Sequence, residues 1–268
     1  MVKKLIKYDF RSFLRLLLPV QLILIGIAAI NRIIQLFEKS DSNVYSSIFV
    51  SSCVLYGVAI GVLLIMTTIV AIIRFYQGMY SNEGYLSHTL PVSPTQHIFS
   101  KLLISIIFYA GSLLAVFLSF MVITLGEVNI EIFKAAGYLI GKVFKEYGSE
   151  TIAYIIEAFL LVIAARISVI LMYYFCISVG QLVSKKRILL AFGVYFGLYT
   201  LSQILGTIFI IIISLNLQWV TDIYTWMGNN PHAALHIYLI GMLVIEAVLG
   251  LVYFLFVKHI MSKKLNLT

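Results

Sequence analysis

Long apolar runs separated by short polar segments dominate this chain of 268 residues. Six of the runs are long enough to cross roughly 30 Å of hydrocarbon as helices. The longer runs must tilt or extend out of the bilayer. The pattern predicts an all-α integral membrane protein, with a single transmembrane domain over residues 1–268 and spans at about 17–37, 45–73, 102–125, 151–183, 188–214 and 234–257.

The composition agrees with a membrane protein. Hydrophobic residues make up 62% of the chain and charged residues 11%, whereas about a quarter of the residues in soluble domains are charged. Cys53 and Cys176 both fall within predicted spans, so we expect two small apolar side chains and not a disulfide. Neither predicted water-side face has enough chain for a catalytic domain.

Basic residues gather in alternate connections of the predicted helices. They precede span one, join spans two and three and spans four and five, and follow span six. The positive-inside rule therefore predicts that both termini are cytoplasmic. We interpret the net charge of +8 as this topology signal and not as a nucleic-acid surface. The residues are Lys3, Lys4, Lys7, Arg11, Arg15, Arg74, Lys101, Lys185, Lys186, Arg187, Lys258, Lys263 and Lys264.

The first 16 residues are amphipathic. Apolar side chains from Leu5 to Leu17 share one helical face, and basic side chains from Lys3 to Arg15 share the other. This pattern predicts an interfacial helix on the anionic cytoplasmic leaflet. We expect Pro19 to break that helix from the first span.

A polar loop at 74–101 interrupts the apolar pattern between spans two and three. A short helix around Ser81–Leu90, held between two membrane helices, would suit the docking of a water-side partner. Ser93 and Gln96 form a predicted capping box with proline at the first helical position, which should start the next helix. The candidate docking residues are Glu83, Gly84, Tyr85, Leu86 and His88.

Three ionisable residues, Glu157, Arg166 and Glu246, fall within predicted spans. Charge in hydrocarbon costs at least a few kcal/mol and usually faces a partner or a cavity. One hypothesis is an Arg166–Glu246 pair, or an Arg166 exposed to a polar translocation path. The alternative is a structural pair or a side chain that reaches the interface, without a substrate role.

Two further segments, 126–150 and 215–233, are predicted to lie outside. The first should form one or two short amphipathic helices. The second contains Trp219, Tyr224 and Trp226, which fit an interfacial aromatic belt or a short re-entrant helix at an outer gate.

The sequence shows no nucleophile–base set. His232 and His236 are four residues apart, as two metal ligands on one helix would be, but no third ligand lies near them in the sequence. We therefore predict no catalytic residue, no metal and no cofactor bound by this chain.

The six spans, the basic amphipathic start and one specific run of residues resemble the permease subunits of bacterial ABC-type exporters. That run is Glu83-Gly84-Tyr85-Leu86, followed by Thr89-Leu90-Pro91-Val92-Ser93 and Lys101. The external segments are small, and in this the chain is similar to compact permeases that export amphipathic or antimicrobial peptides, of the phenol-soluble-modulin or lantibiotic type.

This resemblance implies that the loop between spans two and three is a coupling helix that docks on a separate ATPase subunit, which holds ATP and Mg. Two permease copies or paralogues and two ATPases would assemble in the cytoplasmic membrane of a bacterium. The chain would move amphipathic peptides, or lipid-like or drug molecules, outward without being an enzyme itself. The segment between spans five and six would line the outer gate.

Two other classes stay open. The first is an ion-coupled secondary carrier that uses Glu157, Arg166 and Glu246. Such carriers usually show inverted repeats and broken helices at mid-membrane, and neither is clear here. The second is a membrane scaffold or sensor subunit with no transport path.

Overall fold

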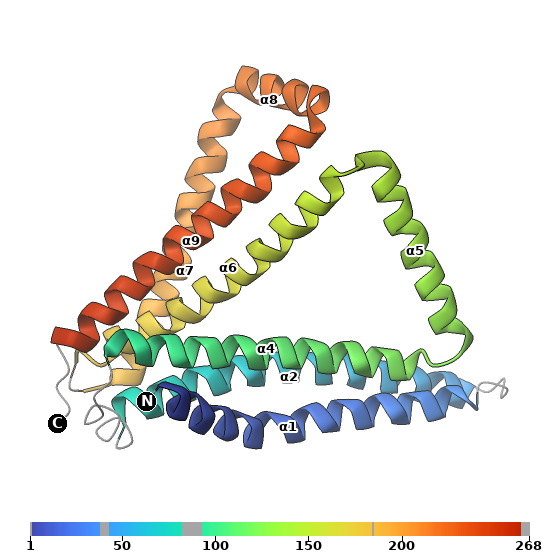
Figure 1. Ribbon diagram of the computed structural model, residues 1–268, viewed down its shortest axis with the longest axis horizontal. Helices are drawn as coiled ribbons and strands as arrows, with labels where there is room; N and C mark the ends of the chain where they lie inside the picture. The colour runs from blue at the N-terminus through green and yellow to red at the C-terminus, as the bar shows by residue number, and fades with distance from the viewer. Residues whose placement is uncertain (1, 38–42, 82–92, 184, 264–268) are drawn as a thin grey trace. The chain divides into compact units, whose positions relative to one another are not determined.

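The computed structural model of this protein describes residues 2–37, 43–81, 93–183 and 185–263. The regular structure of these residues is helical (Figure 1). The helices, in chain order, are α1 (Val2–Gln35), α2 (Asn43–Tyr80), α4 (Pro94–Ile123), α5 (Glu127–Tyr147), α6 (Glu150–Gly180), α7 (Arg187–Leu215), α8 (Leu217–Asn229) and α9 (Pro231–Lys263).

Among the described residues, six helices are long and apolar enough to cross a membrane, namely α1, α2, α4, α6, α7 and α9. They correspond to the six predicted spans, so that prediction is confirmed and the chain is a multi-pass helical membrane protein. Helix α2 has 38 residues and is about 57 Å long at 1.5 Å per residue. It therefore exceeds the roughly 30 Å of hydrocarbon by a wide margin.

The chain divides into two compact units, Met1–Gly141 and Lys142–Thr268. The first unit contains α1, α2 and α4, and the second contains α6 to α9. The division falls within α5.

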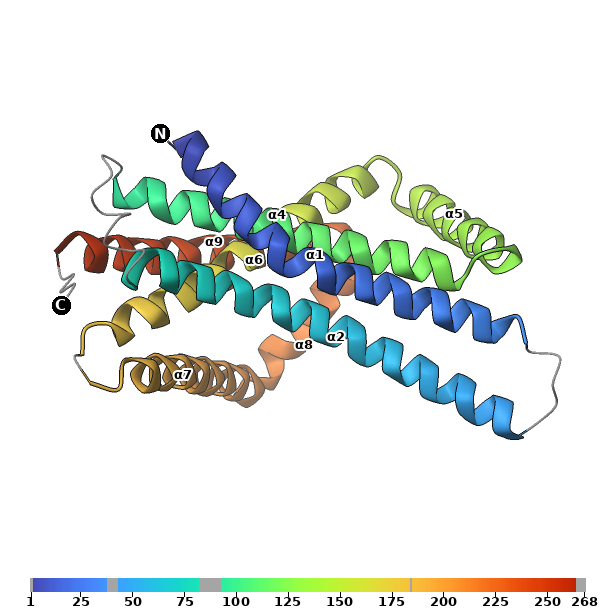
Figure 2. The same ribbon diagram turned by 90° about the horizontal axis from the view of Figure 1, so that it is seen from below.

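In the first unit, α1, α2 and α4 lie side by side (Figure 1, Figure 2). Near the start of α1, the rings of Phe13 and Phe108 stack with their centroids 5.2 Å apart. Both belong to a buried cluster that takes residues from all three helices: Phe13, Leu17, Val70, Ala71, Ile104 and Phe108.

Hydroxyl groups connect the same three helices. Ser112 of α4 accepts a hydrogen bond from Gln21 of α1 at 3.3 Å, and its hydroxyl lies 2.8 Å from that of Thr67 of α2. A second contact of 2.8 Å joins the hydroxyls of Tyr56 on α2 and Ser119 on α4. Such bonds matter in a membrane because lipid tails are as apolar as the side chains that face them.

In the second unit, α6 packs against both α9 and α7. The rings of Phe175 on α6 and Tyr253 on α9 lie 5.7 Å apart, and those of Tyr173 on α6 and Tyr195 on α7 lie 5.8 Å apart. The short helix α8 connects α7 to α9 and contacts both. Helix α7 has no buried residue, so most of its surface is available to lipid or to a partner.

The order in which residues of two helices meet gives the relative direction of the helices within each unit. Asp9 and Gln21 on α1 meet Lys101 and Ser112 on α4 in the same order, so these two helices run parallel. Helix α2 runs antiparallel to α4, because its earlier residue Tyr56 meets the later residue Ser119. Helices α6 and α9 are parallel, as the contacts in the next section show. Alternating directions are what successive crossings of a membrane require.

The predicted start of α4 is confirmed. The Ser93 side chain accepts a hydrogen bond from the Gln96 backbone N–H, the Gln96 side chain accepts one from the Ser93 backbone, and Pro94 opens the helix. At the ends of α5, Gly126 and Gly148 take positive φ angles of 106° and 56°. Glycine adopts such angles without a steric penalty, which lets the chain turn sharply into and out of α5.

The expected break at Pro19 is absent, because α1 continues through this residue from Val2 to Gln35. Proline removes one backbone hydrogen bond, which membrane helices tolerate when neighbouring helices support them. The amphipathic start and the first span therefore form one helix. Its buried side includes Asp9 as well as Phe13 and Leu17, which differs from the purely apolar face that the sequence predicted.

Both segments predicted to lie outside contain helices. The segment 126–150 forms the single helix α5, and the segment 215–233 contains α8. Trp219, Tyr224 and Trp226 all lie on α8 with exposed side chains. Their assignment to an outer gate stays a prediction.

We predict that Gly180→Ala destabilises the protein by about 1 kcal/mol or more, as overpacking does. A Cβ atom on Gly180 would lie 2.7 Å from the Arg187 carbonyl oxygen and 2.9 Å from the Ala191 Cβ atom. A backbone atom cannot give way easily, so this clash outweighs the usual benefit of alanine over glycine in a helix. The measurement is the thermal unfolding midpoint in one detergent.

Gly250→Ala is the matched control in the same unit. Its added Cβ atom would meet nothing closer than the Ser168 Cα atom at 3.6 Å, which is ordinary van der Waals contact. Equal midpoints for the two variants would contradict the prediction.

Candidate functional site

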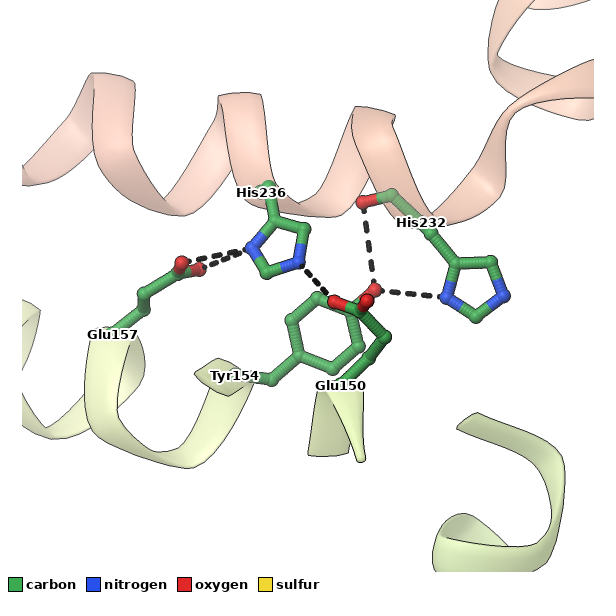
Figure 3. Close-up of polar contacts among 5 residues, drawn as sticks. All are labelled: Glu150, Tyr154, Glu157, His232 and His236. Carbon is green, nitrogen blue, oxygen red and sulfur yellow. Dashed lines mark hydrogen bonds and ion pairs between the residues drawn. The ribbon is translucent and has the colours of Figure 1, made fainter. Parts of the chain in front are cut away.

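Polar and ionisable side chains within membrane helices mark candidate sites, because lipid gives them no partner. The second unit gathers five such residues where α6 and α9 begin (Figure 3). We call them the His236 cluster: Glu150, Tyr154 and Glu157 on α6, and His232 and His236 on α9.

The His236 ring lies between two carboxylates. Its Nδ1 atom is 2.8 Å and 2.9 Å from the two carboxylate oxygens of Glu157, and its Nε2 atom is 2.9 Å from Oε2 of Glu150. A neutral imidazole has only one N–H to donate. With both carboxylates ionised, the two contacts therefore require the doubly protonated imidazolium, which donates from both nitrogens.

The two carboxylates differ in their access to water. The side chain of Glu157 is 19% exposed, that of Glu150 53% and that of His236 25%. Water and salt screen the contact with Glu150 more strongly. The Glu157–His236 contact is therefore the stronger of the two ion pairs.

Tyr154 makes the second connection between α6 and α9. Its hydroxyl lies 3.0 Å from Nδ1 of His232, and its ring centroid lies 4.5 Å from that of His236. Tyr147, at the end of α5, meets Tyr154 and His232 edge to face. The buried Tyr154 ring thus fills the space between the two histidines, which fixes their orientation.

Helical periodicity explains why these residues meet. Positions 150, 154 and 157 share one face of α6, and positions 232 and 236 share one face of α9. Tyr154 pairs with His232, and Glu157 pairs with His236 three to four residues further along both helices. The order is the same on both helices, so α6 and α9 run parallel.

Within the part of the chain that the structure describes, no group of three or more His, Cys, Asp or Glu side chains could hold a metal ion. The chemistry that the His236 cluster offers is hydrogen bonding and proton exchange.

The first unit contains a different polar contact, the ion pair of Asp9 and Lys101. The Lys101 ammonium nitrogen lies 3.1 Å from Oδ1 and 3.3 Å from Oδ2 of Asp9, and both side chains are only 6% exposed. A buried charge must be paired to be tolerated. The pair therefore fastens the start of α1 to the start of α4.

Gly78 on α2 makes room for this pair. A Cβ atom on Gly78 would lie 2.7 Å from the Cε atom of Lys101, so a side chain there would displace the lysine. Phe75 and Met79 on α2 and His97 and Ile98 on α4 are buried nearby in the sequence. Both helix ends that flank the predicted docking loop are thus held in the protein interior.

The three charged residues predicted within spans, Glu157, Arg166 and Glu246, have different surroundings in the structure. Glu157 joins His236, a partner that the sequence reasoning did not assign to it. Arg166 and Glu246 are half-buried, Arg166 has an interaction of its own, and their pairing stays a prediction. Arg166 is nine residues from Glu157, which at about 100° per residue is half a turn away, so it points away from the face of α6 that meets α9.

The predicted docking residues Glu83, Gly84, Tyr85, Leu86 and His88 lie outside the described residues. Their role stays a prediction.

The sequence reasoning missed Asp9, Lys101, Glu150 and Tyr154 as members of polar clusters. A signal was present for some of them. Asp9 is the single acid among the basic residues of the first segment, and the spacing of His232 and His236 matches that of Glu150, Tyr154 and Glu157 on a facing helix. Sequence alone gives no register between two helices, so the partners could not be named.

Comparison with protein-family models, with curated proteins and with solved structures found no match to this chain. The class that the structure defines is a multi-pass helical membrane protein, and any finer assignment depends on the residues themselves.

We predict that Lys101→Met destabilises the protein by about 3 kcal/mol or more, because it leaves the Asp9 carboxylate buried without a partner. The double variant Asp9→Asn, Lys101→Met should lose much less stability, since no buried charge is left. The free energy of unfolding of both variants is measured in mixed micelles. A double variant less stable than the single one would contradict the prediction.

Proposed function

We propose that this chain is the membrane-spanning subunit of an ATP-driven exporter in the cytoplasmic membrane of a bacterium. It would act with a second copy or a paralogue and with separate ATPase subunits that dock on the loop between α2 and α4. The substrates would be amphipathic or antimicrobial peptides, or lipid-like or drug molecules, that enter from the membrane.

The observation that carries this proposal is the anchoring of the two helix ends beside the predicted docking loop. Helix α2 ends in buried residues, including Met79, and α4 begins with a buried turn that contains His97 and Lys101. The Asp9–Lys101 pair ties this turn to α1. A docking loop can drive membrane helices only if its ends do not yield, and these ends are fixed in a packed core.

The mechanism would be a two-state one. ATP closes the ATPase dimer, the docked loops move with it, and the anchored helices carry the displacement into the membrane. ATP binding must favour one arrangement of the membrane helices over the other, since a ligand without such a preference shifts nothing.

One observation favours the second candidate, an ion-coupled carrier. Glu157 and His236 form a polar contact within two apolar helices, and proton relays in carriers are built from such residues. Against it, α6 and α9 are continuous helices, whereas carriers bind their ions at broken ones.

We predict that Glu83→Ala with Tyr85→Ala weakens association with the ATPase several-fold and leaves membrane insertion intact. The chain is expressed with its neighbouring open reading frames and isolated in mild detergent, and any ATPase that copurifies is quantified. The physical reason is the loss of one charged and one aromatic contact at the docking loop, the kinds of residue that dominate interfaces.

The matched control is Glu131→Ala with Tyr138→Ala, the same substitutions on α5, where both side chains are exposed. This variant should retain the ATPase. Equal retention by both variants would contradict the docking assignment, and recovery of the wild-type chain without any ATPase would favour the carrier.

A further inference from the structure

We propose that His236, Glu150 and Glu157 form a proton-binding site that holds the beginnings of α6 and α9 together. The bound proton would bridge the two helices, and its loss would let these ends separate. The inference concerns the second unit alone and does not depend on how transport is powered.

The hydrogen-bond geometry at His236 requires an additional proton. Both ring nitrogens lie within 2.9 Å of carboxylate oxygens. With the neutral ring and two ionised carboxylates, one bare nitrogen would face an oxygen with no hydrogen between them. The observed contacts therefore need one proton more than this neutral arrangement contains, on the ring or on a carboxyl group.

Other titratable groups lie around His236. On α6 these are Tyr154 together with the two carboxylates, and on α9 the nearest is His232. Tyr154 bonds to His232, so these two groups are already paired with each other. Among the residues that the structure describes, no other group therefore competes with Glu150 and Glu157 for the His236 ring nitrogens.

The described side chains of the neighbouring helices α5 and α8 add no charge partner to His236. On α5, Tyr147 contacts Tyr154 and His232 through its ring. Helix α8, which also packs against α9, contributes Asp222 and Tyr224, and both are exposed. None of the described residues on α5 or α8 has a hydrogen bond or an ion pair with His236.

Loss of this proton would weaken the contact between α6 and α9. A deprotonated ring would keep one hydrogen bond and place its bare nitrogen against the other carboxylate, which repels it. Two ionised carboxylates would then face each other across the ring. Membrane helices are held by only a few such contacts, so this change would favour separation. Low pH should therefore keep the ends closed, and rising pH should open them.

The test measures the distance between spin labels on α6 and α9 in lipid nanodiscs over about pH 5 to 9, a range that covers ordinary imidazole titration. The labels replace the exposed residues Ile152 and Ile237, in a chain whose Cys53 and Cys176 have been changed to alanine. The proposal expects a longer mean distance at high pH. A wild-type distance that does not change with pH would overturn it.

Two substitutions of the histidine identify the proton site. His236→Arg keeps donors for both carboxylates at every pH, so the short distance should persist throughout the range. His236→Gln cannot hold a charge, so the pH-dependent shift should disappear. A full pH-dependent change in the label distance in either variant would overturn the proposal. If one variant does not fold, the other still tests the proposal.

The controls lie on the same helix. His259→Gln changes an exposed histidine near the other end of α9, and His232→Gln changes the one that bonds to Tyr154. Both should keep the pH-dependent shift. If the pH-dependent shift were lost in His232→Gln and kept in His236→Gln, the proton would belong to His232, and the proposal would be overturned.

Glu157→Gln gives an independent readout. Its amide can donate to the bare ring nitrogen while the other nitrogen donates to Glu150, so the neutral ring is satisfied and the short distance should hold at high pH. Opening of this variant at high pH to the wild-type extent would contradict the role of the second carboxylate.

Discussion

The structure depends on one constraint, which is that lipid offers polar groups no partner and apolar side chains no penalty. Apolar side chains therefore give membrane helices little reason to prefer one another over lipid. The specific contacts of each unit are polar ones, such as Ser112 with Gln21 and Thr67, or aromatic and close-packed ones. These contacts fix the register of the helices, and the apolar surface around them fills the space.

The two ion-pair sites differ in strength for a physical reason. Asp9 and Lys101 are nearly inaccessible to water, and breaking such a pair leaves a buried charge that costs about 3 to 5 kcal/mol. His236 and Glu150 reach water, which screens their ion pair and weakens it. The first contact is suited to holding helices in place. The second is suited to a contact that must open and close.

The sequence carried enough information to predict the six apolar helices and the capping box at Ser93, because both depend on residues close together in the chain. The predicted helix break at Pro19 was wrong, because the tertiary support of a membrane helix overrides the local effect of a proline. Asp9 with Lys101, and Glu157 with His236, could not be predicted, since each pair depends on the register of two helices far apart in sequence. Arg166 shows the same limit: its charge was a fair signal, but the sequence does not say what meets its face of α6, which is opposite to that of Glu157.

The polar clusters also bear on the choice between the two transport mechanisms. An ion-coupled carrier needs its titratable groups where an ion must bind to cross, whereas a gate needs them at one end of the helices. Glu150 and Thr151 begin α6, and His232 and His236 lie in the first turns of α9, so the proton site is at a helix end. A site in that position can control opening but cannot carry a proton through the span. The energy for transport would then have to enter elsewhere, and the anchored helix ends beside the loop between α2 and α4 are the part of the first unit that suits that role.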